Sequence, residues 1–228
     1  MTPKARIIAA LRNEQPDIVP VTLGLSEMVP VRKSGLSYID YFWREQRNLT
    51  HDRCDTEQAF GGDVFLHSAE GASPHDPEVT ITALSESPEE VVFEERIHTR
   101  KGDLVGVKRV TLTESIAMLK GCVDDPEADH EKVRETLRHP DSKDFSGYLD
   151  AWNYVGDAGH CGLWLSTPID WWALLRGTPE KMIYDLLDHE ELMTDLFNAY
   201  TDYAVALLTD FLSRHRTVAD SIALGGST

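Results

Sequence analysis

The stretch from His160 to Gly177, HCGLWLSTPIDWWALLRG, constrains the fold of this chain more than any other. It opens with an apolar run, residues 161–165, which is too short for a helix and predicts a strand buried on both faces. Pro168 cannot donate an N–H to a sheet, so the strand must end before it, and the apolar residues that follow fit a helix closed by Gly177. A buried strand followed by a helix is typical of α/β proteins, which bind ligands at the carboxyl ends of their strands.

Three other apolar segments predict core strands of the same kind, at residues 18–23, 64–67 and 218–224. Helical patterns separate them, and the clearest helix starts combine a capping residue with a proline, at Thr2-Pro3, Asp125-Pro126 and Thr178-Pro179. Four parallel strands are half of the eight that close a (β/α)8 TIM barrel. We therefore expect an α/β fold in a single domain, residues 1–228, that corresponds to the N-terminal half of such a barrel.

Residues 79–113 depart from this repeat, because their apolar positions alternate as in an antiparallel hairpin, with Lys101-Gly102-Asp103 as the turn. We expect this β-hairpin to be an insertion after the second barrel strand. The hairpin is the most basic patch of the chain, through Arg96, His98, Arg100, Lys108 and Arg109. It is therefore either a solvated ribbon or a lid that attracts an anionic substrate.

The composition limits the partners. The 22 Lys and Arg face 39 Asp and Glu, and the resulting net charge of −17 repels phosphate backbones and anionic membranes. No apolar run approaches the ~18 residues that span a bilayer, so we expect neither nucleic acid nor a membrane as partner. The three cysteines are widely spaced without a Cys-x-x-Cys motif, which indicates reduced thiols and a cytoplasmic location.

Polar side chains that follow predicted strand ends are the candidates for a site. His67 is a general base or ligand, or else a hydrogen-bonded structural residue. Asp170 lies beside two tryptophans, which would raise its pKa and make it an acid; the alternative is a helix cap. Glu27 is a carboxylate at a strand mouth, or else a solvated charge. We assign catalysis to His67, Asp170 and Glu27, and substrate binding to Glu70, Ser166, Thr167, Arg32 and Trp171.

No self-sufficient catalytic motif is present in the sequence. Gly-x-Gly-x-x-Gly, Gly-x-Ser-x-Gly and His-Glu-x-x-His are all missing, so nucleotide-binding and hydrolase functions lack their parts. His160 and Cys161 are neighbours on a predicted strand and point to opposite faces, so they do not form one zinc site. We expect no metal site within this chain.

Two segments resemble the uroporphyrinogen decarboxylase superfamily, which also includes corrinoid-dependent methyltransferases. STPIDWWALLRG resembles the Gly-x-Pro-aromatic segment that follows a barrel strand in this superfamily and ends in Gly. TPKARIIAALRNEQPDIVPV, residues 2–21, is similar to the superfamily's usual start, a helix followed by a Pro-Asp turn and the first strand. The order of elements between them agrees, so the resemblance covers nearly the whole chain and implies a TIM barrel of this type.

The resemblance implies two alternative reactions. Decarboxylases of the superfamily have an Arg-rich loop after the first strand and an Asp at the end of the second, whereas this chain has only Arg32 and Lys33 in GLSEMVPVRKSG, and His67. A porphyrinogen would therefore meet too few guanidinium groups. We favour a corrinoid-linked methyltransferase of a small substrate. The alternative is a decarboxylase of a porphyrinogen or other carboxylated substrate, served by Arg32, Arg176 and His67.

The cofactors and partners follow from the reaction. The methyltransferase alternative implies zinc, held by ligands in the other half of the barrel, and a corrinoid, carried by a corrinoid protein; the decarboxylase alternative implies no cofactor. A third alternative is a non-catalytic half-barrel, because an open four-stranded sheet has exposed edges that invite pairing. We accordingly expect a homodimer or association with the missing barrel half.

Overall fold

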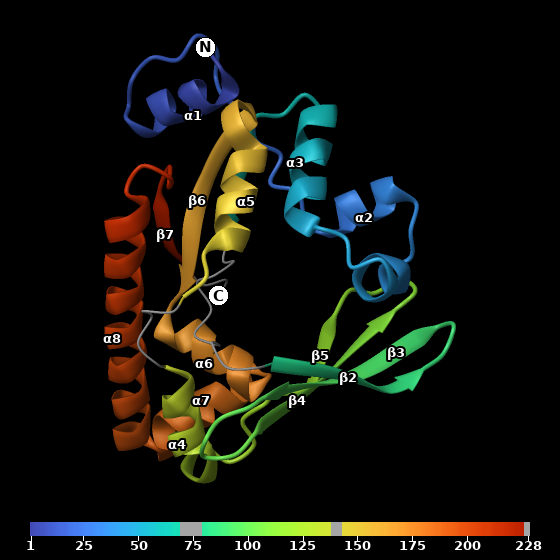
Figure 1. Cartoon of the computed structure of the whole chain (residues 1–228), viewed down its shortest axis with the longest axis vertical. Coiled ribbons are helices and arrows are strands. Elements are labelled where there is room, and N and C mark those ends of the chain that lie inside the picture. Colours follow the sequence, from blue (N-terminus) through green and yellow to red (C-terminus); the bar gives the residue numbers. More distant parts are fainter. Residues whose placement is uncertain (69–78, 138–142, 226–228) are drawn as a thin grey trace. The chain divides into compact units, whose positions relative to one another are not determined.

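The computed structural model describes residues 1–68, 79–137 and 143–225 (Figure 1). Contacts between backbone segments divide the chain into two compact units, each made of segments far apart in the sequence. The first unit comprises residues 1–72, 144–165 and 214–223, and the second comprises residues 73–143, 166–213 and 224–228. That the whole chain is one domain stays a prediction.

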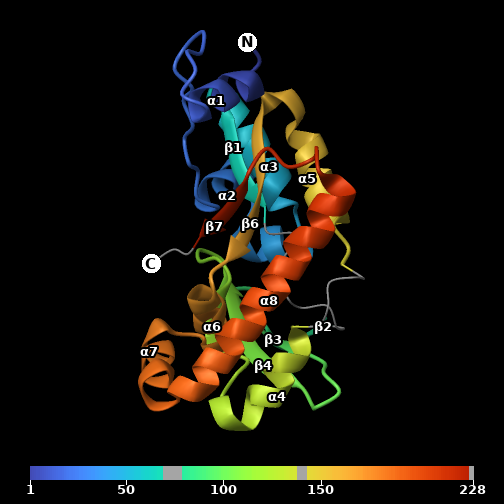
Figure 2. The same cartoon turned by 90° about the vertical axis from the view of Figure 1, so that its left-hand side faces the viewer.

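A parallel pair of strands forms the centre of the first unit. Strand β1 (Val64–Ser68) pairs with β6 (Gly159–Ser166), and β7 (Ile222–Gly225) is bonded to the other edge of β6 (Figure 2). These strands confirm the predictions for residues 64–67 and 161–165, while β7 begins later than predicted. Val64 lies opposite Gly159, where a Cβ atom would approach the Val64 carbonyl to within 3 Å, so only glycine fits.

The predicted strand at residues 18–23 is wrong, because the chain there forms no strand. The Asp63 N–H donates to the Val21 carbonyl at 2.7 Å, but Val21 and Leu23 donate to the carboxylates of Asp63 and Glu57. Side-chain acceptors thus take the place of a second strand's carbonyls. Pro20, which has no N–H, interrupts any regular ladder in this segment.

Helices surround the sheet of the first unit, and two of them, α3 (Leu49–Ala59) and α5 (Ser146–Val155), contact one another and β1. In α1 (Pro3–Leu11) the Thr2 hydroxyl accepts a hydrogen bond from the Ala5 N–H, which confirms the predicted cap. The remaining helices of this unit are α2 (Met28–Ser34), the π-helix η1 (Ile39–Arg44) and the 3-10 helix η3 (Gly156–Ala158).

An antiparallel sheet belongs to the second unit, with the strand order β2 (Val79–Glu86), β3 (Glu90–Ile97), β4 (Leu104–Thr111) and β5 (Ala117–Lys120). The predicted hairpin is confirmed, since β3 and β4 are antiparallel and Gly102 turns between them with a φ of 116°. The fold is thus mixed α/β, with a parallel and an antiparallel sheet. The described residues form no closed barrel, and the half-barrel stays a proposal.

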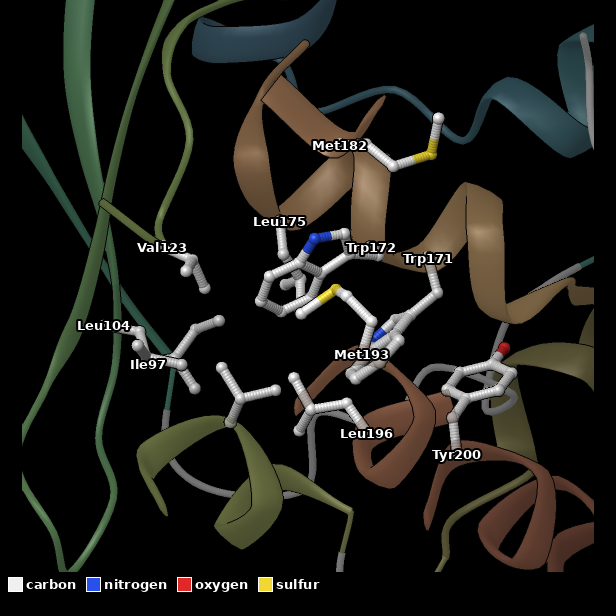
Figure 3. Packing of buried hydrophobic residues seen from close by; sticks show 11 residues of the cluster. Ile97, Leu104, Val123, Trp171, Trp172, Leu175, Met182, Met193, Leu196 and Tyr200 are labelled. Atoms are coloured by element: carbon white, nitrogen blue, oxygen red, sulfur yellow. The ribbon is translucent and has the colours of Figure 1, made fainter. Parts of the chain in front are cut away.

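The helices of the second unit enclose an apolar core (Figure 3). They are α4 (Pro126–Thr136), α6 (Pro168–Arg176), α7 (Pro179–Asp188) and most of α8 (Glu190–His215). The predicted caps Asp125 and Thr178 are confirmed. Trp172 is fully buried in this core, together with Leu196 from α8 and the hairpin residues Ile97 and Leu104.

A buried ion pair joins three segments of this unit. The Arg176 guanidinium donates to both carboxylate oxygens of Asp185, at 2.7 and 3.2 Å, and to the Val123 carbonyl at 2.9 Å. The Trp172 indole N–H donates to the same carboxylate at 2.8 Å. A Cβ atom on Gly121 would collide with the backbone at Arg176, so the chain before Val123 packs directly on the end of α6.

We expect Asp185→Asn to lower the free energy of unfolding by about 3–5 kcal/mol, because it leaves the Arg176 charge buried and without a charged partner. Urea denaturation followed by circular dichroism measures the change. Lys120→Gln is the matched control, since its pair with Asp124 is exposed and such pairs contribute about 0–1 kcal/mol. Equal effects of the two substitutions would contradict the anchoring role of Arg176 and Asp185.

Candidate functional site

His67 lies near the carboxyl end of β1, with its ring across the neighbouring strand β6. Its Nε2 atom is 3.3 Å from the Ser221 hydroxyl, which belongs to the segment just before β7. Gly162 on β6 makes this reach possible, because a Cβ atom there would lie within 3 Å of both the imidazole ring and the Ser221 hydroxyl. Three adjacent segments therefore contribute one residue each to the contact.

Backbone hydrogen bonds hold Ser221 in place. The Asp220 N–H donates to the Cys161 carbonyl at 3.3 Å, and the Leu163 N–H donates to the Ser221 carbonyl at 2.9 Å. The Asp220 carboxylate accepts from the Cys161 N–H at 2.9 Å and pairs with Lys4 of α1 at 3.1 Å. The hydroxyl opposite His67 is thus fixed by the sheet rather than by a free loop.

Three rings lie together on this face of the sheet. The register places Phe65 beside His160 and His67 beside Gly162, so all four project to the same side. The Phe65 ring stacks on His160 with centroids 4.6 Å apart and meets the edge of His67 at 5.0 Å. His160 is fully buried, whereas His67 is half-buried and Phe65 is exposed. The reachable imidazole of this cluster is therefore that of His67.

Burial lowers the pKa of both imidazoles. For His67 burial is the cause, and for His160 burial is the largest cause, partly offset by the Asp220 carboxylate and reinforced by His67. A ring with a pKa below its ordinary value near 6.5 is neutral at pH 7. Neutral His67 can accept a proton from a bound molecule, and the Ser221 hydroxyl, as donor or acceptor, can complement either tautomer.

The residues predicted around Pro168 belong to the second unit. Thr167 is the N-cap of α6, and its hydroxyl bonds with the Asp170 side chain and accepts from the Asp170 N–H. Asp170 thus supports the cap that Thr167 forms, and its role as an acid stays a prediction. Ser166, the last residue of β6, and Thr167 line a small pocket beside α8. Trp171 is 3% exposed and stacks on Tyr200 at 4.7 Å, which makes it a core residue (Figure 3).

The remaining predicted residues lie on other elements. Glu27 immediately precedes α2, and Arg32 is exposed in the last turn of that helix. Among the residues that the structure describes, neither joins the hydrogen bonds around His67. Glu70 lies outside the described residues.

The basic hairpin residues are neutralised by neighbouring carboxylates. Arg96 pairs with Glu94 and Asp103, and Lys108 pairs with Glu95 at 2.6 Å. Carboxylates also accompany the other three: His98 with Asp103, Arg100 with Glu135, and Arg109 with Glu90 and Glu114. This arrangement favours the solvated ribbon over a lid that attracts anions.

Two of the three cysteines, Cys54 and Cys122, have surroundings that disfavour the thiolate form. Burial raises the pKa of Cys54, and it raises that of Cys122 to about 12, so both thiols stay protonated at neutral pH. Among the residues with described positions, no group of three His, Cys, Asp or Glu side chains is placed to hold a metal ion. No chemical step is therefore assigned to zinc.

Comparison with known protein families, with curated proteins and with solved structures gave no significant match to this chain. Within the described ranges, no helix combines the length and the apolar character needed to cross a bilayer.

The sequence identified one member of the cluster and missed its partners. The place of His67 after an apolar run indicates a site residue, whereas the pattern around Ser221 indicates only a strand and the neighbours His160 and Cys161 indicate no site. The contact of His67 with a hydroxyl on the far side of the neighbouring strand leaves no local pattern in the sequence. Gly162 was the available clue, because a glycine inside a buried strand often marks a close approach.

We expect the stability of the protein to fall as the pH drops below about 6.5, because the unfolded chain then binds more protons at these two histidines than the folded chain. The loss continues until the pH passes below the lowered pKa values of the folded state. Each pKa unit between the two states corresponds to about 1.4 kcal/mol per group. Urea denaturation between pH 8 and 5 measures the effect.

His160→Phe, which keeps a ring against Phe65, and the more conservative His67→Gln each remove one titrating group. The fall in stability with pH should become shallower in both variants. An unchanged pH dependence in both would show that these two imidazoles are not held neutral by the fold.

Proposed function

We propose that this chain belongs to an enzyme of the uroporphyrinogen decarboxylase type that transfers a methyl group from a corrinoid to a small substrate. His67 is the general base of the reaction in this proposal. The observation that carries the proposal is the His67–Ser221 contact across Gly162, at the carboxyl end of a parallel strand pair. Ligands of α/β enzymes bind at this end of the strands. The sequence resemblance supports the class of reaction.

The neutral state of His67 favours proton removal over proton donation. A thiol acceptor has an ordinary pKa near 8.5 and reacts as its thiolate, so it must lose a proton before it can take up a methyl group. In the proposed step the thiol proton moves to His67, and the sulfur retains the electron pair that bonds to the methyl carbon. The Ser221 hydroxyl orients the imidazole. The corrinoid, carried by a separate protein, would supply the methyl group and would keep the electron pair of the carbon–cobalt bond that breaks. No residue described here is assigned to hold the corrinoid.

The decarboxylase alternative has weaker support. It needs cationic groups for the substrate carboxylates and an acid for the resulting carbanion. Arg176 is committed to Asp185 in the core of the second unit, and Arg32 is a single exposed guanidinium on α2. An imidazole with a lowered pKa is also a poor reservoir of protons at pH 7.

A second candidate function, a half-barrel that assembles with a partner chain, is favoured by one observation. Ile18, Val19, Val21 and Leu23 are 42–77% exposed in the segment that failed to form a strand. Such a concentration of exposed large apolar side chains marks interaction surfaces.

In this candidate function, residues 18–23 pair with a strand of the partner, which is a second copy of the chain or the other barrel half. Light scattering tests whether the partner is a second copy of the chain. A wild-type dimer that Val19→Glu converts to a monomer supports dimerisation through this segment, and a wild-type monomer contradicts it.

We expect His67→Gln to lower the turnover of methyl transfer by about 10²–10⁴-fold, because it removes the base and keeps a polar side chain of similar length. The assay follows methyl transfer from methylcobalamin to small thiols, with carbon dioxide release from uroporphyrinogen measured in parallel. His189→Gln, on α7's C-cap in the second unit, is the matched control and should retain turnover. Undiminished methyl transfer by His67→Gln would contradict the role of His67; carbon dioxide release without methyl transfer would favour the decarboxylase.

We expect Gly162→Ala to reduce turnover as well, because its Cβ atom takes the space occupied by the His67 ring and the Ser221 hydroxyl. Gly35→Ala is the control: Gly35 has a positive φ of 76° but open space around its Cβ position, so it tests backbone strain without ring displacement. Turnover and far-ultraviolet circular dichroism are measured for both. Full activity in folded Gly162→Ala would show that the position of His67 over β6 does not matter.

A further inference from the structure

A small pocket in the second unit lies beside the turn between β6 and α6. It has a volume of about 190 Å³ and is open to solvent on one side. Its walls come from Ser166, Thr167 and Pro168, from the α8 residues Tyr200, Thr201, Ala204, Val205 and Leu208, and from Leu224 of β7. The pocket shares no residue with the His67 cluster.

Three side-chain hydroxyls of the pocket wall, those of Tyr200, Thr201 and Thr167, have partners within the protein. Tyr200 donates to the Ser166 carbonyl at 3.0 Å, and Thr201 donates to the Phe197 carbonyl of its own helix at 2.7 Å. Thr167 caps α6 and bonds with Asp170. Burial raises the pKa of Tyr200 to about 12, so its hydroxyl remains a neutral donor. These groups are therefore occupied, and the surface offered to a ligand is made of methyl, methylene and ring carbons.

The rim of the pocket is apolar and exposed. Val205 is 60% exposed and Leu224 is 69% exposed, although each lies beside other apolar side chains of the pocket. Covering such carbon surface with an apolar molecule is favourable, by roughly 25 cal/mol per Å² removed from water. A cavity of about 150 Å³ lined by apolar side chains accommodates benzene in another protein, so this pocket has room for one small aromatic or branched aliphatic group.

We propose that this pocket is a binding site for a small, uncharged apolar molecule, of the size of a substituted benzene. The proposal does not depend on the chemistry of His67. No charged residue is among those that line the pocket, so a carboxylate, phosphate or ammonium group would lose its hydration there without a partner. The specificity therefore rests on shape and on the exclusion of charge.

Toluene is a suitable probe, and two substitutions test the site from different sides. Ala204→Phe fills the pocket from α8, and Val205→Glu places a charge at its exposed rim. Leu212→Glu is the matched control, because it adds the same charge at an exposed position of α8 that does not line the pocket. Saturation-transfer NMR of toluene measures affinity, and circular dichroism confirms that each variant is folded.

We expect saturable toluene binding by the wild-type chain and by Leu212→Glu, with affinity weakened at least about tenfold in Ala204→Phe and Val205→Glu. Benzoate, which has the same ring and a negative charge, should bind at least about tenfold more weakly than toluene to the wild type. The proposal is overturned if toluene binding does not saturate or if Ala204→Phe binds toluene as well as the wild type. It is also overturned if sedimentation shows a dimer of the wild-type chain that Val205→Glu converts to a monomer.

Discussion

A buried charge pair connects the helices of the second unit to the chain that leaves β5. Arg176 and Asp185 are 9% and 5% exposed in their side chains, so neither charge is solvated well enough to stand alone. The guanidinium therefore donates hydrogen bonds to Asp185 and to the carbonyls of Val123 and Asp124. The Trp172 indole N–H also donates to the Asp185 carboxylate. This network fixes α6 against α7 and against the chain that leaves β5.

Local chemistry explains why much of this unit was predictable. Helix starts at Asp125 and Thr178 depend on a side-chain oxygen and a following proline, both visible within a few residues. The hairpin turn at Gly102 is likewise local. The Arg176–Asp185 pair was not predicted, because the two residues are nine positions apart and on different helices. Their sequence neighbourhoods do not show that the two side chains are buried against each other. The same residue appeared from the sequence as a candidate for substrate binding.

The wrong strand prediction in the first unit has a physical cause. Residues 18–23 have the composition of a core strand, but a strand also needs a neighbour, and the available neighbours here are the carboxylates of Asp63 and Glu57 rather than a row of carbonyls. Composition records the preference of a segment and not the presence of its partner. The candidate site shows the converse. The sequence around His67 does not show which groups surround its imidazole. The register of β1 on β6 shows them, because it places His67 over Gly162 and next to Ser221.

The two polar centres of this protein use burial in opposite ways. At Arg176 the fold compensates burial with an opposite charge, and the guanidinium is held by hydrogen bonds to Asp185 and to the carbonyls of Val123 and Asp124. At His67 the nearest hydrogen-bonding group is a neutral hydroxyl, and the cost of burial appears as a lowered pKa. An imidazole that is uncharged, half-buried and hydrogen-bonded to a neutral hydroxyl can still gain a proton. That difference, more than the presence of histidine at a strand end, is what makes the His67 cluster the better candidate for catalysis.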